Sequence, residues 1–357
     1  MFRVQAIIEQ RERIMPAASP SALTTHSVLS RLLEAVVGPD RAAEALEILW
    51  IDPGLHGAGE RASRAQVAMA LNAALFLDLL DRVPTAARYV AQVRAAAEPI
   101  VFDHGALRTI DGQTGALPSG HDAFGRFLGP LGYEIGGIYP LPALTMTGRA
   151  YVHRDLPEAV PQFFVSELHV SKLPQGARDA AAAIFTTSHD PLGADECSAL
   201  EALAAQGDCT VEDGVTILRG ALRAFERQHA TPSLADYEAL LEHSKEGAWI
   251  ATEGNAFNHA TTRVPDVETL AERLKAQGYP LKPTVEISRN GRVRQTAFLA
   301  DTVERPFRDA DGTVVTRPVP GSFYEFISRD LDPANGSLDL TFDSGNATGI
   351  FAVTRAR

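Results

Sequence analysis

Two short stretches of the sequence contain the same set of chemically active residues. VFDHGALRT holds His104 and Arg108, and AFNHATTRV holds His259 and Arg263; each stretch reads Phe, then Asp or Asn, then His, three residues and Arg. Residues two and four apart on a β-strand point to the same face, so each histidine shares a face with its arginine. The pattern predicts two strands that each present a metal ligand followed by a cation.

The repetition continues after each histidine. A helix ending in Leu-Gly-Tyr follows His104, and one ending in Gln-Gly-Tyr follows His259; a Gly-Arg dipeptide then recurs in both segments. FFVSELHVS and SFYEFISRD come next, and Glu167 is taken as the counterpart of Glu325 because it lies 63 residues after His104 and Glu325 lies 66 after His259. The recurrence of several landmarks in order favours a duplicated β-α-β-β-β module over a chance likeness of two unrelated strands.

If the two modules curve around a common cavity, His104, His259 and Glu325 can converge. Two histidines and one carboxylate form a facial triad, which leaves three adjacent positions of an octahedral Fe(II) open for substrate and O2. A 2-oxo acid can occupy two of them, and an arginine can hold a second carboxylate through paired hydrogen bonds. Arg108 fits that substrate-binding role, and Arg263 is a second candidate.

Structural explanations exist for each of these residues. A lone strand histidine is more often structural than a ligand, but the twin placement favours metal binding. Glu325 lies in the apolar run FYEFI, where a carboxylate needs a partner, either a metal or a cation such as Arg329. Glu167 is a possible fourth ligand or a group that supports the ligands.

Composition limits the class of protein. The chain has 357 residues, 45% of them hydrophobic, and a net charge of -12, which argues against nucleic acid or an anionic membrane as a partner. The N-terminal stretch lacks a long apolar run and no segment is long enough to span a bilayer, so we expect no signal peptide and no membrane span. With only two cysteines, a reduced, cytoplasmic protein is the simplest expectation.

Periodicity divides the chain into four segments. Apolar residues at helical spacing dominate the first and third segments, and strand patterns with turns dominate the second and fourth. Ser63 and Asp266 are expected helix N-caps, and Asn290-Gly291 is a strong hairpin signal. The expected segments are a helical region at 1–98, the first mixed module at 99–176, a helical insert at 177–247 and the second mixed module at 248–357.

The motifs FDHGALRT, EGNAFNHATTRVPDV and GSFYEFISRD resemble those of the 2-oxoadipate dioxygenase/decarboxylase family. That family belongs to the vicinal-oxygen-chelate superfamily, which includes glyoxalase I, extradiol dioxygenases and hydroxymandelate synthase. The resemblance covers most of the chain, and the spacing of His, His and Glu is its most specific part. It implies an α+β fold in which duplicated β-α-β-β-β modules form a curved sheet around a metal.

The resemblance also implies a reaction and its residues. Fe(II) would be held by His104, His259 and Glu325, and Arg108 would bind the substrate carboxylate. The family reaction converts 2-oxoadipate and O2 to 2-hydroxyglutarate and CO2 in bacterial lysine catabolism. Zn or Ni could replace Fe(II) in a purified sample, because both have higher affinity for such ligands. The expected partners are therefore a 2-oxo dicarboxylate and O2, and the sequence leaves the oligomeric state open.

The chain departs from the family pattern after the triad glutamate, where family members extend further. The segment 345–349 (GNATG) could contact substrate through its backbone or form a plain turn. Two other functions remain open. A glyoxalase-type lyase or isomerase becomes more natural if Glu167 is a fourth ligand, since fewer metal positions are then free. A non-catalytic ligand-binding protein on the same fold is the other.

Overall fold

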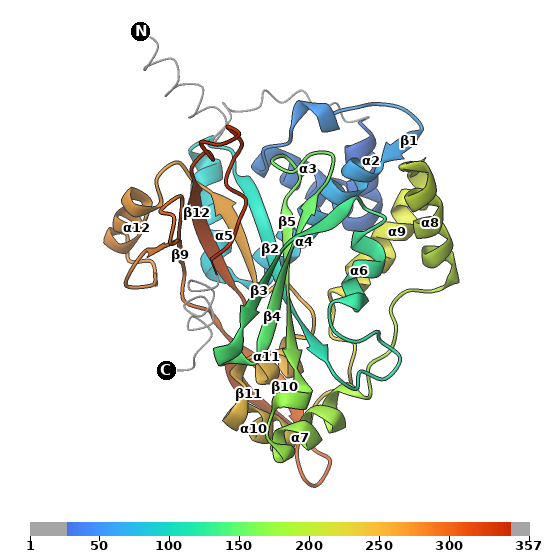
Figure 1. Cartoon of the computed structure of the whole chain (residues 1–357), viewed down its shortest axis with the longest axis vertical. Helices are drawn as coiled ribbons and strands as arrows, with labels where there is room; N and C mark the ends of the chain where they lie inside the picture. The colour runs from blue at the N-terminus through green and yellow to red at the C-terminus, as the bar shows by residue number, and fades with distance from the viewer. Residues whose placement is uncertain (1–26, 344–357) are drawn as a thin grey trace.

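A curved sheet of eight strands runs through the centre of the computed structural model, which describes residues 27–343 of the chain (Figure 1). Across the sheet the strands lie in the order β3-β4-β5-β2-β7-β12-β9-β8. Strands β2 and β7 pair antiparallel at the centre, and each pairs on its other side with a parallel strand, β5 or β12. The strands are β2 (Val101–Asp111), β3 (Tyr133–Leu141), β4 (Met146–His153), β5 (Gln162–His169), β7 (His259–Arg263), β8 (Glu286–Ile287), β9 (Val293–Ala297) and β12 (Phe323–Arg329).

The two halves of this sheet are built alike. The first half runs β2, helix α6 (Asp122–Leu128), β3, β4 and β5. The second half runs β7, helix α12 (Val267–Ala276), β8, β9 and β12. Outward from the central pair, β5, β4 and β3 therefore correspond to β12, β9 and β8. The predicted α+β fold, with two β-α-β-β-β modules joined in one curved sheet, is confirmed.

Local sequence signals explain several element boundaries. The Ser63 hydroxyl accepts a hydrogen bond from the backbone N–H of Gln66, and the Gln66 side chain accepts one from Ser63 N–H, so a capping box starts helix α4 (Arg64–Arg82). Asp266 caps helix α12 by accepting the backbone N–H groups of its first turn. Strands β8 and β9 pair across the turn that contains Asn290 and Gly291, as the hairpin signal predicts.

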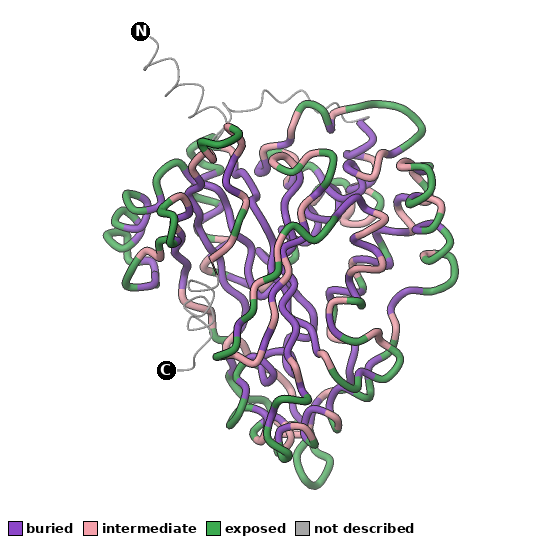
Figure 2. Tube along the Cα trace, viewed as in Figure 1, coloured by how far each residue is buried: buried purple, intermediate pink, exposed green. Residues whose placement is uncertain are grey.

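Within the described residues four helices precede the sheet, and the last two of them contact β12 and β7 on one of its faces. Alternate strand residues, such as Leu107, Ala260 and Tyr324, are buried with these helices in one hydrophobic core. Figure 2 shows the central strands buried along most of their length. The opposite face of β2, β7 and β12 is therefore the one that presents the histidines. The helices are α2 (Val28–Val37), α3 (Pro39–Ile48), α4 (Arg64–Arg82) and α5 (Pro84–Ala95).

A second group of helices connects the two halves of the sheet. Helix α11 continues through Trp249, so the chain remains helical beyond residue 248, where we expected the second mixed segment to begin. A separate hairpin of β10 (Thr302–Arg308) and β11 (Val314–Pro320) packs with α10 and α11 in a smaller core. The connecting helices are α7 (Gln175–Phe185), α8 (Ala194–Gln206), α9 (Val211–Ala224), α10 (Leu234–His243) and α11 (Lys245–Glu253).

Several elements were not predicted, among them the nine-residue strand β3 and some shorter ones. Strand β3 contains Gly136, Gly137 and Pro140 and pairs with β4 alone, and an edge strand can tolerate such residues. Its sequence lacks the alternation of a half-buried strand. The remaining short elements are strands β1 (Arg61–Ser63) and β6 (Asp208–Thr210), and the 3-10 helices η1 (Pro53–Leu55), η2 (Pro142–Leu144) and η3 (Val170–Lys172).

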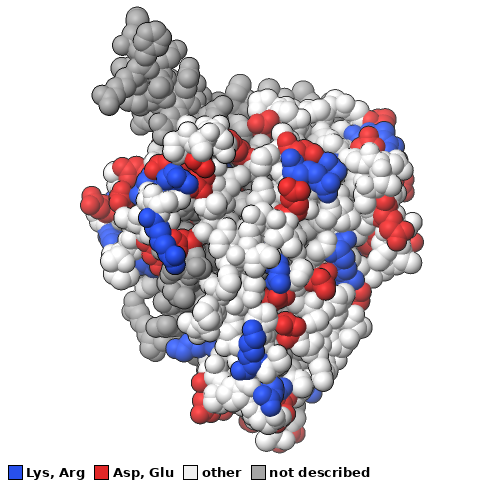
Figure 3. All heavy atoms as spheres, in the orientation of Figure 1, with Lys and Arg blue, Asp and Glu red and all other residues white. Residues whose placement is uncertain are grey.

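The charged side chains, the two cysteines and the lengths of the helices can be compared with what the composition predicts. On the face shown in Figure 3, basic and acidic side chains are interspersed. Cys197 is exposed, Cys209 is buried, and both are free thiols. Within residues 27–343, every helix is too short or too polar to cross a bilayer. The segment 345–349, considered above as a substrate contact, lies outside the described residues.

Candidate metal centre

Three neighbouring strands bring His104, His259 and Glu325 together. His104 on β2 lies opposite Thr261 on β7, which in turn lies opposite Glu325 on β12. Residues directly opposite each other in a sheet point to the same face, so these three form one row across it. His259 is two residues from Thr261 on β7 and therefore points the same way. The sequence repeat and the strand order together account for this convergence.

The potential ligand atoms lie close together in a buried site. All three residues offer an atom, and these atoms lie within 4.8 Å of one another. Glu325 Oε2 is 3.7 Å from His104 Nε2 and 3.6 Å from His259 Nε2. Thr261 donates a hydrogen bond of 2.7 Å to the same carboxylate oxygen. Two imidazole nitrogens and a carboxylate oxygen at one point are a donor set suited to a divalent metal.

The electrostatics of the site also fit a bound cation. Burial raises the pKa of Glu325 to about 8, although Lys282 and the Thr261 hydrogen bond act in the opposite direction. Burial lowers the pKa of both His104 and His259, so both rings are neutral near pH 7. Among the described residues, Glu325 Oε1 has no hydrogen-bond partner. A divalent cation would compensate the buried carboxylate charge and engage an otherwise unsatisfied oxygen.

Arg108 lies on the same face of β2 as His104, four residues along the strand. Its side chain is fully buried, and its guanidinium carbon is 4.9 Å from the centre of the Trp249 ring on α11. Burial lowers the pKa of Arg108 to about 10, and Glu246 counteracts this shift, so the group is cationic at neutral pH. Its charge contributes to the lowered pKa of His259. The site therefore has a buried cation at one end.

Arg263, the second arginine of the repeat, has a different position. Its guanidinium forms an ion pair of 3.0 Å with Asp103, the residue before His104. Asp103 also binds Arg329 through contacts of 2.8 to 3.1 Å and accepts a hydrogen bond of 2.8 Å from His104 Nδ1. Arg329 is thus paired with Asp103 rather than with Glu325, the partner that the sequence also allows. Arg263 lies behind His104 in this cluster.

Glu167 does not join the three potential ligands. It lies opposite Thr109 of β2, an odd number of residues from His104, so it points to the other face of the sheet. There it binds Arg149 at 2.5 Å and accepts the backbone N–H of His121 at 3.1 Å. In the described part of the chain, Glu167 therefore lies away from the three potential ligands, and its position fits neither a fourth ligand nor a group that holds a ligand in place.

Strand pairing also corrects our alignment of the two halves. Gln162 lies opposite His104 in the first half, as Phe323 lies opposite His259 in the second. Counting two residues onward from each, the position that corresponds to Glu325 is Phe164, not Glu167. The aligned Gly-Arg dipeptides differ too, because Gly148 lies within strand β4 whereas Gly291 lies in a turn.

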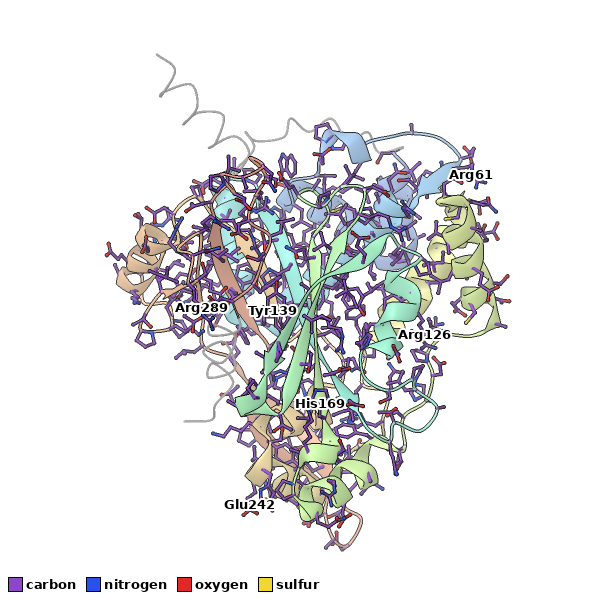
Figure 4. The ribbon with its side chains drawn as sticks, viewed as in Figure 1. Arg61, Arg126, Tyr139, His169, Glu242 and Arg289 are labelled. Atoms are coloured by element: carbon purple, nitrogen blue, oxygen red, sulfur yellow. The ribbon has the colours of Figure 1, made fainter. Side chains whose placement is uncertain are left out.

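Aromatic side chains surround the site. The Phe342 ring is 4.8 Å from the His104 ring and 4.8 Å from the Phe164 ring. Phe323 stacks on the His259 ring at 4.7 Å. The hydroxyl of Tyr139, labelled near the middle of Figure 4, accepts the backbone N–H of Phe342 at 3.1 Å. These rings give the centre apolar walls.

The sequence analysis did not single out Asp103, Lys282 or Phe342, which lie beside the three potential ligands. Asp103 carried a signal, since an aspartate inside an apolar strand and beside a candidate ligand needs a buried partner. The sequence around Lys282 gives no such signal. In the structure its backbone N–H donates to the carbonyl of Ala297, the residue opposite Glu325, so Lys282 continues the row of residues across the sheet. Lys282 is buried and forms an ion pair of 2.9 Å with Glu286.

Comparison with known proteins points to the same family as the sequence motifs. A family model described as 2-oxoadipate dioxygenase/decarboxylase matches residues 72–332. The 2-oxoadipate dioxygenase/decarboxylase of Mycobacterium tuberculosis is 27% identical over 265 residues, which cover 71% of this chain and 62% of that protein. The matched region thus spans less than two thirds of this mycobacterial relative.

Solved structures share the fold. A putative glyoxalase superfamily protein from Ralstonia eutropha JMP134 has 50% sequence identity and a TM-score of 0.85, and the match covers 88% of this chain and 98% of that one. Hydroxyglutarate synthase from Oryza sativa, solved in complex with 2-oxoadipate, has 20% identity and a TM-score of 0.63, with 86% and 95% covered. The first likeness extends over nearly the whole of that structure.

Proposed function

Because the chain belongs to the 2-oxoadipate dioxygenase/decarboxylase family, we propose that it is an Fe(II)-dependent enzyme that oxidatively decarboxylates 2-oxoadipate or a related 2-oxo dicarboxylate. With 2-oxoadipate and O2 the products would be 2-hydroxyglutarate and CO2, a step of lysine catabolism in the cytoplasm. The observation that carries the proposal is the buried group of His104, His259 and Glu325 on one sheet face, with the cation Arg108 on the same face.

His104, His259 and Glu325 would hold the metal. Fe(II) bound there would supply the activation of O2, for which side chains alone have no equivalent. Both histidines are neutral near pH 7 and can donate a lone pair without first losing a proton. Glu325 must release a proton when the metal binds below about pH 8. Thr261 then donates its hydrogen bond to the ionised carboxylate and fixes its orientation.

Arg108 would bind the substrate carboxylate that is remote from the 2-oxo group. A guanidinium matches a carboxylate through two parallel hydrogen bonds, and both charges gain when water is excluded. Trp249 lies against this guanidinium and restricts its position. Arg108 would thereby set the distance between the metal and the far end of the substrate, which selects the length of the dicarboxylate. Arg263 would contribute to substrate binding only indirectly, through Asp103 and His104.

Aromatic walls would hold the methylene chain of the substrate and limit the access of water. Phe164, Phe323 and Phe342 each contact a ligand ring or one another beside the metal centre. Exclusion of water strengthens electrostatic interactions in the site and protects a reactive oxidant from side reactions. The lyase or isomerase alternative depended on Glu167 as a fourth ligand, and the position of Glu167 on the other sheet face removes that support.

Oxygen consumption by Fe(II)-reconstituted, anaerobically purified protein tests this function directly. We expect 2-oxoadipate to trigger O2 uptake with equimolar CO2 release, and His259→Ala to abolish both. Arg108→Ala should raise KM for the dicarboxylate far more than it lowers iron content. A wild-type protein that binds one metal yet consumes no O2 with any 2-oxo dicarboxylate would overturn the oxygenase assignment. Loss of iron from Arg108→Ala would show that its role is wrongly assigned.

A further inference from the structure

Asp103 is the centre of a buried charge cluster that adjoins the metal centre. Its side chain is fully buried, as is that of Arg329, and Arg263 is 5% exposed. Burial alone would raise the pKa of Asp103, but Arg329 and Arg263 outweigh it and hold that pKa well below its usual value. The two arginines thus compensate the buried negative charge of the carboxylate beside His104.

A β-bulge lets Asp103 contact its own neighbour in sequence. Adjacent residues of a regular strand point to opposite faces, so Asp103 and His104 should not meet. The pairing of β2 with β7 shifts between Phe102 and His104, which leaves Asp103 without a partner residue across the strand. Such bulges redirect a side chain. Here the Asp103 carboxylate accepts the hydrogen of His104 Nδ1 at 2.8 Å, and His104 Nε2 is left facing Glu325.

Within the part of the chain that the structure describes, the second histidine of the repeat has no such support. Asn258 replaces the aspartate, and its backbone stays in the sheet, donating to Ala106 O at 2.9 Å and accepting from Phe323 N–H at 3.0 Å. The pairing that starts at His259 continues without a shift up to Thr261. Among the described residues, His259 Nδ1 has no hydrogen-bond partner. The two ligand rings therefore differ in what fixes their tautomer and orientation.

The same cluster also holds the segment that covers His104. Arg329 donates to the backbone carbonyls of Asp339 at 2.7 Å and Thr341 at 3.0 Å. These bonds place Phe342 beside the His104 ring, and the guanidinium carbon of Arg329 is 5.2 Å from the centre of the Phe342 ring. The orientation of the ligand and the position of its cover thus depend on one carboxylate and one arginine.

We propose that Asp103 is a positioning residue for the metal centre: it fixes His104 with Nε2 directed at the metal, and Arg329 joins it to the segment 338–343 that covers the ligand. The inference rests on the proposed function only in that the three residues bind a metal. A carboxylate behind a ligating histidine raises the basicity of the ring and prevents its rotation, and removal of such a partner lowers metal affinity about 10- to 100-fold.

Titration of the metal-free full chain with Co²⁺ tests the proposal through the absorption spectrum of the bound ion. Asp103→Asn should lower Co²⁺ affinity by about 10- to 100-fold and alter the spectrum, because His104 can rotate. Asp111→Asn is the matched control. Asp111 lies on the same strand and binds a histidine in the same way, His169 Nδ1 at 2.7 Å, but that pair is remote from the ligands; Figure 4 labels His169 near the end of β5.

The possible outcomes separate the two proposals. If wild type does not bind Co²⁺, the metal centre itself is wrong. If wild type binds but Asp103→Asn binds equally well, Asp103 has only a structural role and the inference fails. If Asp103→Asn does not fold, Asp103→Glu serves instead, because it keeps the charge that Arg263 and Arg329 need and displaces the carboxylate from Nδ1. Asp103→Glu should also weaken Co²⁺ binding, and wild-type affinity there would equally overturn the inference.

Arg329→Gln tests the second part of the proposal by hydrogen exchange. It leaves Asp103 and Arg263 in place but removes contacts to the carbonyls of Asp339 and Thr341. Backbone amides of the segment 338–343 should then exchange faster than in wild type, whereas amides of the distant hairpin β10–β11 should not change. Unchanged exchange in the segment would show that Arg329 does not hold the cover over His104.

Discussion

The two halves of the sheet share a topology but contribute differently to the candidate metal centre. Each supplies one histidine from its strand in the central pair, His104 from β2 and His259 from β7. The second half also supplies Glu325, whereas the first half has Phe164 at the corresponding position. The two like halves thus place one potential ligand each at corresponding positions, and the difference between Glu325 and Phe164 provides the third potential ligand on one side and an apolar wall on the other.

The halves differ again immediately behind the two histidines. Asp103 is displaced by a bulge and supports His104, while Asn258 stays in the regular pairing of its strand. His104, which Asp103 supports, belongs to the first half, whereas Glu325 belongs to the second half. The two buried carboxylates, Asp103 and Glu325, therefore come one from each half of the sheet and have different roles. This arrangement limits the number of like charges buried at one point.

The sharpest way to test this division is to remove the carboxylate from the second half. Glu325→Gln should weaken Co²⁺ or Fe²⁺ binding by about 10³-fold, near 4 kcal/mol, since one of three ligand groups loses its charge. Glu167→Gln, on the other face, should leave the affinity unchanged. Metal titrations of both variants provide the measurement. A large loss of metal affinity in Glu167→Gln would show that Glu167, and not Phe164, is the counterpart of Glu325.

Placing a carboxylate at the corresponding position of the first half should not reproduce the second. Phe164→Glu buries an acid among Ala106, Ala150 and Phe342, and a buried charge without a partner costs about 3 kcal/mol or more of unfolding free energy. Urea denaturation of the metal-free protein measures this loss, with Phe164→Leu as the control for packing alone. A Phe164→Glu variant as stable as Phe164→Leu would mean that the two halves are interchangeable here.

The metal affinity of the wild type should depend on pH through Glu325. Its folded-state pKa is raised to about 8, so metal binding below that pH displaces one proton, and affinity should rise about tenfold per pH unit between roughly pH 6.5 and 8. The metal-free protein should show the opposite trend in stability. The protonated acid favours folding below its unfolded pKa, and this contribution is lost as pH rises through about 8.

Both trends should disappear in Glu325→Gln, which has no proton to release at this position. Calorimetry of metal binding in two buffers of different ionisation enthalpy counts the released protons. A wild-type affinity that is flat between pH 6.5 and 8 would contradict a raised pKa for Glu325.

The smallest expected effect concerns the pair of Lys282 and Glu286 on the side of the second half. The positive charge of Lys282 lowers the pKa of Glu325 and has a larger influence than Glu286, which raises it. Replacing both residues, as Lys282→Met with Glu286→Gln, avoids leaving one buried charge unpaired. The pH dependence of metal binding should then move upward by less than about one unit. A downward shift would show that Lys282 does not act on the site.

The amino-acid sequence by itself determined the components of this protein. Helical periodicity, the caps at Ser63 and Asp266 and the turn at Asn290 depend on residues within one or two turns of each other, so local rules predict them. The repeated motif identified His104 and His259 for the same reason, because same-face spacing is a property of a single strand. Local patterns in the chain were therefore sufficient to predict the fold class and to single out the two histidines and the glutamate that the fold brings together.

Tertiary structure alone decided which side chains meet. A shift of an odd number of residues turns a strand side chain to the other face, so an alignment error of three residues paired Glu167 with Glu325 when Phe164 is the correct equivalent. The bulge that turns Asp103 toward His104 is likewise a feature of strand pairing. Strand register is fixed by contacts between residues more than 50 positions apart in sequence, and local pattern does not contain that information.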